Sequence, residues 1–138
     1  MLTVEPYIFY KGNCREAMEF YKSAVGAEIL FSQTVGESPM SGMSDPNNIM
    51  HATIKIGNST LMMSDNCEPG DVPTGTQISL AIGLRDTAKA KEIFDNLAEG
   101  GSITMPLEKT FWAESFGMLT DKFGVKWLIN SEAPRPTE

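Results

Sequence analysis

The sequence predicts an α+β fold in which two paired βαβββ modules form a cupped, eight-stranded mixed sheet. One observation behind this prediction is an internal repeat. An extended apolar run, a helical stripe and a second extended run occur once from Val4 and again from Ile78. In both helical stripes, apolar residues recur at i, i+3, i+4, i+7 and i+8, so each helix buries one face only. Each half then continues into a hairpin-like pair of strands. Two small curved sheets that complete each other, with a cleft between them, account for all three observations.

The chain of 138 residues fits a single domain made of two closely joined halves. We expect the modules at approximately residues 1–65 and 76–132. The segment between them contains turn-forming pairs such as Pro69-Gly70 and Thr74-Gly75, which indicate an irregular linker over residues 66–75. The proline-containing tail, residues 133–138, is predicted to be disordered.

The first half opens with an extended run, Val4–Tyr10, followed by a helix. Asn13 is the expected N-cap of this helix, with Glu16 three residues later in position to reach back to it. The helix ends at Gly26, and a strand starts at Glu28. The following run, residues 36–48, has no periodicity and many glycines and prolines. It predicts a loop, either solvated or acting as a cover over a ligand.

The clearest local prediction is a hairpin of two strands, Met50–Ile56 and Ser59–Asp65, around the turn Gly57-Asn58. Pairing across this turn puts Ile56 opposite Ser59 and Thr53 opposite Met62. Because side chains alternate across a strand, the hairpin has two different faces. The apolar face, which we expect to pack on the helix, carries Met50, Ala52, Ile54, Ile56, Leu61 and Met63. The other face becomes the lining of a cavity if the two halves curve around one, and it carries His51, Thr53, Lys55, Thr60, Met62 and Ser64.

The second half repeats the plan, with a strand over Ile78–Leu84 and a helical stripe over Ala90–Ala98. Gly100-Gly101 ends the helix, and a strand restarts at Ile103. In the last strand, Val125–Ser131, alternation puts Leu128 on the face away from the helix. Trp112 precedes a strand, where it is a candidate either for a cavity wall or for a packing anchor between the modules.

Composition excludes several classes of function. The net charge is −7, which argues against nucleic acid or an anionic membrane surface as the partner, since both reward clustered positive charge. No apolar run approaches the roughly 18 residues that a membrane span needs. No signal peptide is visible at the N-terminus. The two cysteines, Cys14 and Cys67, do not form a disulfide framework, so we expect free thiols and a cytoplasmic location.

Several short segments resemble one known family along nearly the whole chain. They include Pro6-Tyr7, Gly12-Asn13-Cys14, His51-Ala52, Met62-Met63-Ser64-Asp65, Thr110-Phe111-Trp112-Ala113 and the run from Thr120 to Val125. Together they resemble the vicinal-oxygen-chelate superfamily of glyoxalases, dioxygenases and bleomycin-resistance proteins. Within it, the closer likeness is to the PhnB/YjdN branch, often labelled 3-demethylubiquinone-9 3-methyltransferase-like. The resemblance implies paired βαβββ modules and a homodimer. It does not imply a reaction, because one fold hosts many chemistries.

Enzymes of this superfamily hold a divalent metal with His, Glu or Gln side chains from four strands. The resemblance aligns those four positions with Pro6, Met62, Gln77 and Leu128. Proline and leucine offer no donor atom, and a thioether is a soft ligand that suits such metals poorly. We therefore expect no metal and no other cofactor. An altered site that recruits His51, Gln77 and a carboxylate such as Glu114 is the alternative.

These observations favour a small-molecule-binding protein whose ligand is unknown. The candidate ligand-binding residues are Pro6, Ile8, His51, Thr53, Met62, Gln77, Trp112 and Leu128. They mix apolar walls with a few hydrogen-bonding groups, as ligand pockets do. One alternative is a glyoxalase- or dioxygenase-like enzyme with an altered metal site. The other is a structural module whose cavity is filled by its own side chains. A methyltransferase is disfavoured, because no glycine-rich turn joins a strand to a helix to seat a nucleoside cofactor.

Overall fold

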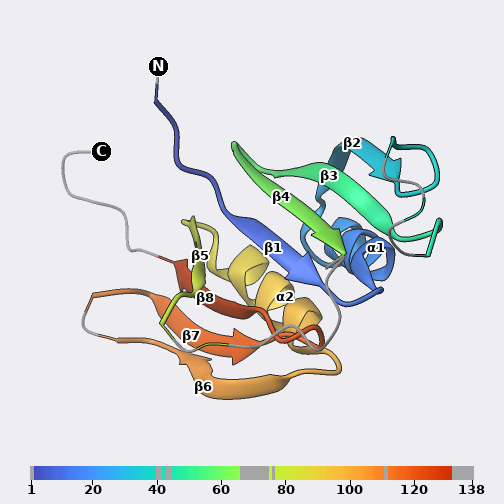
Figure 1. Cartoon of the computed structure of the whole chain (residues 1–138). Coiled ribbons are helices and arrows are strands. Elements are labelled where there is room, and N and C mark those ends of the chain that lie inside the picture. Colours follow the sequence, from blue (N-terminus) through green and yellow to red (C-terminus); the bar gives the residue numbers. More distant parts are fainter. Residues whose placement is uncertain are drawn as a thin grey trace. The chain divides into compact units, whose positions relative to one another are not determined.

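The protein folds as two compact units, Met1–Pro73 and Thr74–Glu138. The computed structural model describes residues 2–39, 42, 45–65, 75, 77–110 and 112–131. Each unit contains one helix and four strands in the order βαβββ (Figure 1). The predicted tail lies outside the described residues, as does the predicted linker apart from Gly75.

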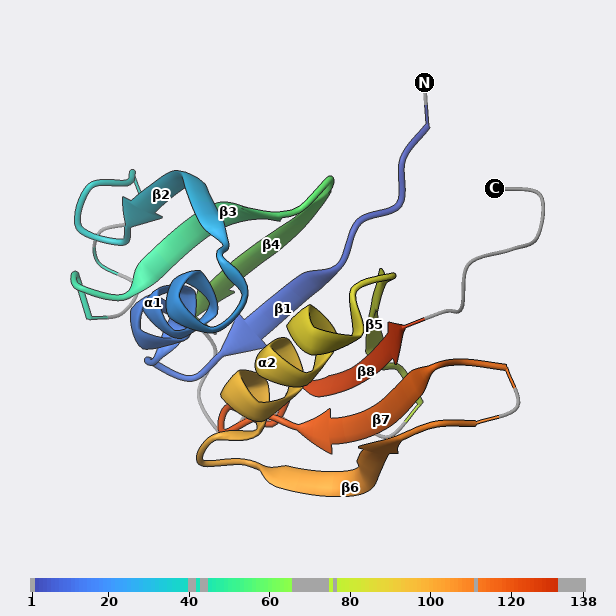
Figure 2. The same cartoon turned by 180° about the vertical axis from the view of Figure 1, so that it is seen from behind.

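The first unit is a four-stranded mixed sheet, sheet A, with one helix on it. Its elements are β1 (Tyr7–Tyr10), α1 (Cys14–Val25), β2 (Glu28–Thr34), β3 (Ile49–Ile56) and β4 (Ser59–Asp65). The strand order is β1-β4-β3-β2. β1 runs parallel to β4, while the other neighbours are antiparallel. Figure 2 shows α1 lying across one face of this sheet. We call the opposite face, which α1 does not cover, the open face of sheet A.

The second unit, built around sheet B, repeats this topology. Its elements are β5 (Leu80–Leu84), α2 (Thr87–Ala98), β6 (Ser102–Glu108), β7 (Ser115–Thr120) and β8 (Lys126–Ser131). The order β5-β8-β7-β6 matches the first unit, with β5 parallel to β8. In the first unit α1 carries the chain from β1 to β2 at the other edge of the sheet, so these two strands run in the same direction. Two antiparallel pairings then make β4 parallel to β2 and therefore to β1.

The core of the first unit is the apolar stripe of α1 against the apolar face of the hairpin. Tyr21, Ile54 and Met63 are fully buried there. Burying a side chain of this size stabilises the fold by about 1.5–3 kcal/mol. The hydroxyl of Tyr10 donates to that of Tyr21 at 3.0 Å, so neither phenol is left unsatisfied in the core. Gly26 ends α1 with a left-handed φ of 73°, a conformation that glycine adopts at no steric cost.

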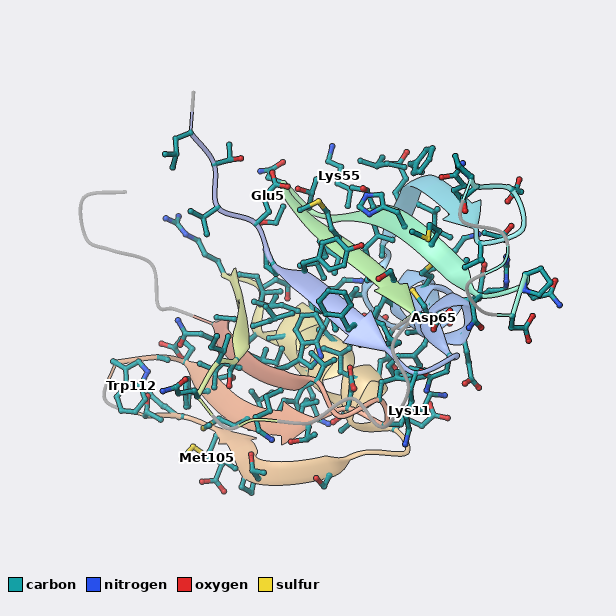
Figure 3. The ribbon with its side chains drawn as sticks, viewed as in Figure 1. Glu5, Lys11, Lys55, Asp65, Met105 and Trp112 are labelled. Atoms are coloured by element: carbon teal, nitrogen blue, oxygen red, sulfur yellow. The ribbon has the colours of Figure 1, made fainter. Side chains whose placement is uncertain are left out.

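A buried carboxylate from the far end of β4 caps helix α1. Asp65 accepts hydrogen bonds from the backbone N–H groups of Gly12, Cys14 and Ile49, at 2.8, 2.9 and 2.8 Å. Figure 3 shows Asp65 at this end of β4, beside α1. The expected side-chain cap by Asn13 is wrong: its Oδ1 accepts only a weak bond from Lys11 N, at 3.3 Å. The first turn of α1 is therefore tied to the sheet by an acceptor that lies far away in sequence.

The core of the second unit depends on a close approach between α2 and β7. Gly117 faces the helix, and a Cβ there would lie 2.7 Å from Cε2 of Phe94. Only glycine fits this position. In this unit the helix cap is local, because the Asp86 side chain accepts from Lys89 N at 3.1 Å. Trp127 is buried, and its Nε1–H donates to Asp121 at 3.0 Å.

The predicted fold class is confirmed: the chain holds two βαβββ units of α+β type. The eight strands form two hydrogen-bonded sheets of four rather than one continuous sheet. The hairpin register is also as predicted, with Ile56 opposite Ser59 and Thr53 opposite Met62. Gly57 takes a positive φ of 57° and Asn58 does not, as in a type II′ turn.

Two strands start two or more residues later than the sequence predicts. β1 begins at Tyr7 instead of Val4, and β5 begins at Leu80 instead of Ile78. Val4 and Ile78 are 91% and 79% exposed, so their apolar side chains belong to no core. The predicted loop is observed as turns, held by a bond from Val35 N to the carbonyl of Asn48. Residues 40, 41, 43 and 44 of that loop lie outside the described part. Neither described helix is long and apolar enough to cross a membrane.

Candidate functional site

The open face of sheet A carries two rows of side chains that cross all four strands. The strand registers align Tyr7 with Met62, Met62 with Thr53, and Thr53 with Phe31. One pleat further along, they align Phe9 with Ser64 and His51 with Gln33. We call these eight residues the His51 face: Tyr7, Phe9, Phe31, Gln33, His51, Thr53, Met62 and Ser64. None of them is an aspartate, glutamate, lysine or arginine.

His51 lies near the middle of this face and is held from both sides. Its Nδ1 lies 3.1 Å from the hydroxyl of Tyr7 on β1. Its Nε2 lies 3.4 Å from Oγ1 of Thr53, two residues along β3. The rings of Tyr7 and Phe31 lie on either side, with centroids 5.6 and 6.1 Å from the imidazole. These contacts fix the plane of the ring, because two hydrogen-bonding groups and two rings restrict both of its torsions.

Three aromatic side chains of this face remain exposed. Phe9 and Phe31 are 54% and 51% exposed, and Tyr7 is 38% exposed. The rings of Tyr7 and Phe9 lie 5.0 Å apart, so β1 presents a continuous aromatic surface. A single exposed apolar residue needs no explanation, whereas a contiguous cluster around a polar group is characteristic of a binding surface.

Sheet B shows that the fold itself does not require these aromatic residues. The equivalent row of sheet B aligns Ala81 with Leu128, Leu128 with Met118, and Met118 with Met105. Ala81 therefore stands where sheet A has Tyr7. In the second row, Gly83 stands in place of Phe9, and Phe116 stands in place of His51. The same βαβββ framework is thus built with small residues on β5, so the aromatic side chains of β1 are not required by the fold.

The structure brings together three of the predicted site residues, namely His51, Thr53 and Met62. Ile8 does not join them, because it is in register with the buried Met63 on the helix-covered face. Pro6 precedes β1, and its carbonyl accepts from Met62 N at 3.0 Å. The sequence prediction chose the wrong phase for β1. It therefore missed Tyr7 and Phe9, whose side chains take the place expected for Ile8.

The other predicted site residues belong to the second unit. Leu128 lies on the open face of sheet B, as predicted. Gln77 precedes β5 and is exposed. Trp112 lies in the turn between β6 and β7, where its ring contacts Phe116 edge-on at 5.3 Å. Figure 3 shows Trp112 at that end of the sheet.

Cys14 is not a nucleophile in the folded protein. Its side chain is fully buried at the start of α1. Burial and the neighbouring carboxylate of Asp65 raise the pKa of its thiol to about 12. A thiol that stays protonated at neutral pH neither attacks a substrate nor binds a metal. Asp65 also occupies the N–H groups at this helix N-terminus, which are the groups that elsewhere bind phosphates.

Of the four residues that the resemblance aligns with the superfamily's metal positions, only Gln77 offers an oxygen donor. Pro6 and Leu128 have no donor atom, and Met62 offers only a soft thioether. His51, the best donor nearby, has its Nδ1 within 3.1 Å of the Tyr7 hydroxyl, so only its Nε2 could turn to a metal. Within the described part of the chain, no three His, Cys, Asp or Glu residues gather as a metal site would require.

Comparison with known proteins identifies the family. The sequence profile of the family described as 3-demethylubiquinone-9 3-methyltransferase matches residues 3–130. The chain belongs to this family. It is 37% identical to protein YjdN of Escherichia coli K12, over 99% of this chain and all of YjdN.

Solved structures agree with this assignment. Protein PA1353 from Pseudomonas aeruginosa is 40% identical, over 97% of this chain and all of that chain, with a TM-score of 0.87. FosX from Listeria monocytogenes, described as a fosfomycin resistance protein, has a TM-score of 0.70 over 96% of both chains. At 10% identity FosX shares the fold alone. The predicted membership of the PhnB/YjdN branch is confirmed by the family match and by the likeness to YjdN.

Proposed function

We propose that this protein binds a small organic molecule on the His51 face, without a metal at the positions that other superfamily members use. The observation that carries the proposal is the exposed aromatic cluster of Tyr7, Phe9 and Phe31 around a hydrogen-bonded histidine. Ligand sites combine apolar walls with a few well-placed polar groups. The His51 face has this composition, and its counterpart on sheet B lacks the histidine and the β1 rings.

Two alternative functions, an enzyme and a structural module, predict different experimental results. An enzyme with an altered metal site requires one tightly held metal ion per chain. A purely structural module requires that the exposed rings serve packing alone. We further propose a homodimer, on the strength of the family resemblance, and a cytoplasmic location, on the strength of the free thiols.

A thermal-shift screen tests the proposal. The compounds are aromatic antibiotics, α-keto acids, quinone-like compounds and phosphonates. A ligand at about 100 times its Kd stabilises the folded protein by about 2.7 kcal/mol. For a domain of this size, that free energy corresponds to a rise in Tm of several degrees.

Phe31→Ala is the informative variant, and Met105→Ala is its matched control. Both residues lie on the outer strand of a four-stranded sheet, at equivalent register positions. They are also similarly exposed, at 51% and 42%. We expect Phe31→Ala to abolish the shift and Met105→Ala to retain it. If no compound shifts the melt of the unmodified protein, or if both variants lose the shift equally, the proposed site is wrong.

A further inference from the structure

The orientation of His51 carries a more specific inference, which rests on the proposed function. A neutral imidazole has one N–H donor and one acceptor nitrogen. Tyr7 approaches Nδ1 at 3.1 Å, and a phenol is a strong donor but a weak acceptor. This contact favours donation from the tyrosine hydroxyl to Nδ1, which places the proton of the ring on Nε2.

The Nε2–H has only a long contact to a described residue. Its neighbour, Oγ1 of Thr53, lies at 3.4 Å, beyond the usual range of 2.7–3.2 Å for an N–H···O bond. Thr53 can rotate its hydroxyl toward another partner, so a ligand oxygen can replace it at little cost. His51 is thus oriented to offer one donor to the surface, with Tyr7 behind it as the positioning residue.

The surroundings of this donor restrict the chemistry of the ligand. The rings of Tyr7 and Phe31 flank the imidazole. None of the eight residues of the His51 face carries a carboxylate, and in the next row on the same side of sheet A Glu28 is in register with Lys55, so the charges of that row are opposite in sign. This balance of charge favours a neutral ligand. The face spans four strands, or about 14 Å at the usual strand spacing of about 4.8 Å. That width accommodates a fused two- or three-ring system.

We propose that the ligand is a neutral, planar, fused aromatic molecule whose carbonyl-type oxygen accepts a hydrogen bond from His51 Nε2–H while its rings pack against Tyr7 and Phe31. A ligand of this class accepts a hydrogen bond from His51 Nε2–H and at the same time covers the exposed rings. Alanine and glycine at the equivalent β5 positions of sheet B provide no such ring surface.

The single histidine of the chain makes the test direct. In protein labelled with ¹⁵N-histidine, the two nitrogen resonances of His51 require no assignment against other histidines. The spectra are recorded at about pH 8.5. We expect the Nε2–H tautomer to dominate. Tyr7→Phe keeps the aromatic ring but removes the phenol donor, and we expect it to shift the population measurably toward the Nδ1–H tautomer.

Three matched probes test the ligand class. 2-Acetylnaphthalene has the rings and the oxygen, 2-ethylnaphthalene lacks the oxygen, and 2-acetyldecalin lacks the aromatic rings. We expect 2-acetylnaphthalene to move the Nε2 resonance and to bind about fivefold to tenfold more tightly than either of the others. His51→Phe should abolish the difference between the two naphthalenes. Met105→Ala should leave all three affinities unchanged.

The outcomes separate this inference from the proposed function. If probes bind in a Phe31-dependent manner but the oxygen has no effect on affinity and the His51 resonances do not move, the ligand class is wrong and the site survives. A dominant Nδ1–H tautomer in the unmodified protein also overturns the inference. If no probe binds and Phe31→Ala converts a dimer into a monomer, the face is a contact between copies, and both proposals fail.

Discussion

The buried thiol of Cys14 makes the stability of this protein depend on pH in the alkaline range. Burial, and then the charge of Asp65, raise the pKa of the thiol from 9.0 to about 12 in the folded protein. In the unfolded chain the thiol loses its proton near pH 9, so between about pH 9 and about pH 12 the unfolded state binds fewer protons than the folded state. The free energy of unfolding therefore falls as the pH rises through this window, and the contribution is fully present below it.

The size of the effect follows from the pKa difference. One proton linked to unfolding changes the free energy by about 1.4 kcal/mol per pH unit. Between about pH 9 and about pH 10.5, Cys14 should therefore remove about 2 kcal/mol of stability. Cys14→Ala removes the titrating group. The variant has a lower free energy of unfolding, because the substitution leaves a small cavity, but this difference does not depend on pH.

The assay is urea unfolding of both proteins at about pH 8 and about pH 10.5, followed by circular dichroism. All other alkaline titrations, including that of Cys67, are common to the two proteins and cancel in the comparison. We expect the unmodified protein to lose about 2 kcal/mol more than Cys14→Ala between the two pH values. If the two proteins lose the same free energy of unfolding, within about 0.5 kcal/mol, burial does not keep the Cys14 thiol protonated and the reasoning is refuted.

Three further predictions concern capping, metal content and assembly. Asp65→Ala leaves three backbone N–H groups, two of them buried, without their acceptor and should cost about 3 kcal/mol or more in chemical denaturation, whereas a loss below about 1 kcal/mol would show that water replaces the carboxylate. Protein purified from metal-supplemented medium should contain no stoichiometric Zn, Ni, Mn or Fe by elemental analysis. One ion per chain that is lost in His51→Ala or Gln77→Ala would favour the enzyme alternative. Light scattering at micromolar concentration should give twice the chain mass of 15.1 kDa, and a mass near one chain would contradict the homodimer.

The hairpin of β3 and β4 was predictable because its information is local. Gly57-Asn58 permits a two-residue turn, and the turn then fixes which residues of the two strands oppose each other. The alternation of polar and apolar residues predicted which face of the hairpin packs against the helix. His51, Thr53 and Met62 could therefore be assigned to one surface from the sequence alone.

The phase of β1 was not predictable, because Tyr7, Ile8, Phe9 and Tyr10 are all apolar or aromatic. Such a run fits either face of a sheet equally well. Its register comes instead from parallel pairing with β4, which is remote in sequence and joined to β1 by no turn that could set it. Only this pairing shows that Tyr7 and Phe9 surround His51 while Ile8 faces the core.

The sequence by itself determined the βαβββ repeat, the helix-facing stripes and the hairpin faces, since each depends on periodicities or turns within a short stretch of chain. The tertiary structure alone decided which side chains complete the His51 face and which group caps α1. Asp65 and Cys14 N–H meet because β4 ends beside the helix start, and Tyr7 meets His51 because β1 and β3 both flank β4. Contacts of this kind depend on the pairing of strands that are distant in sequence, and no local pattern of residues predicts this pairing.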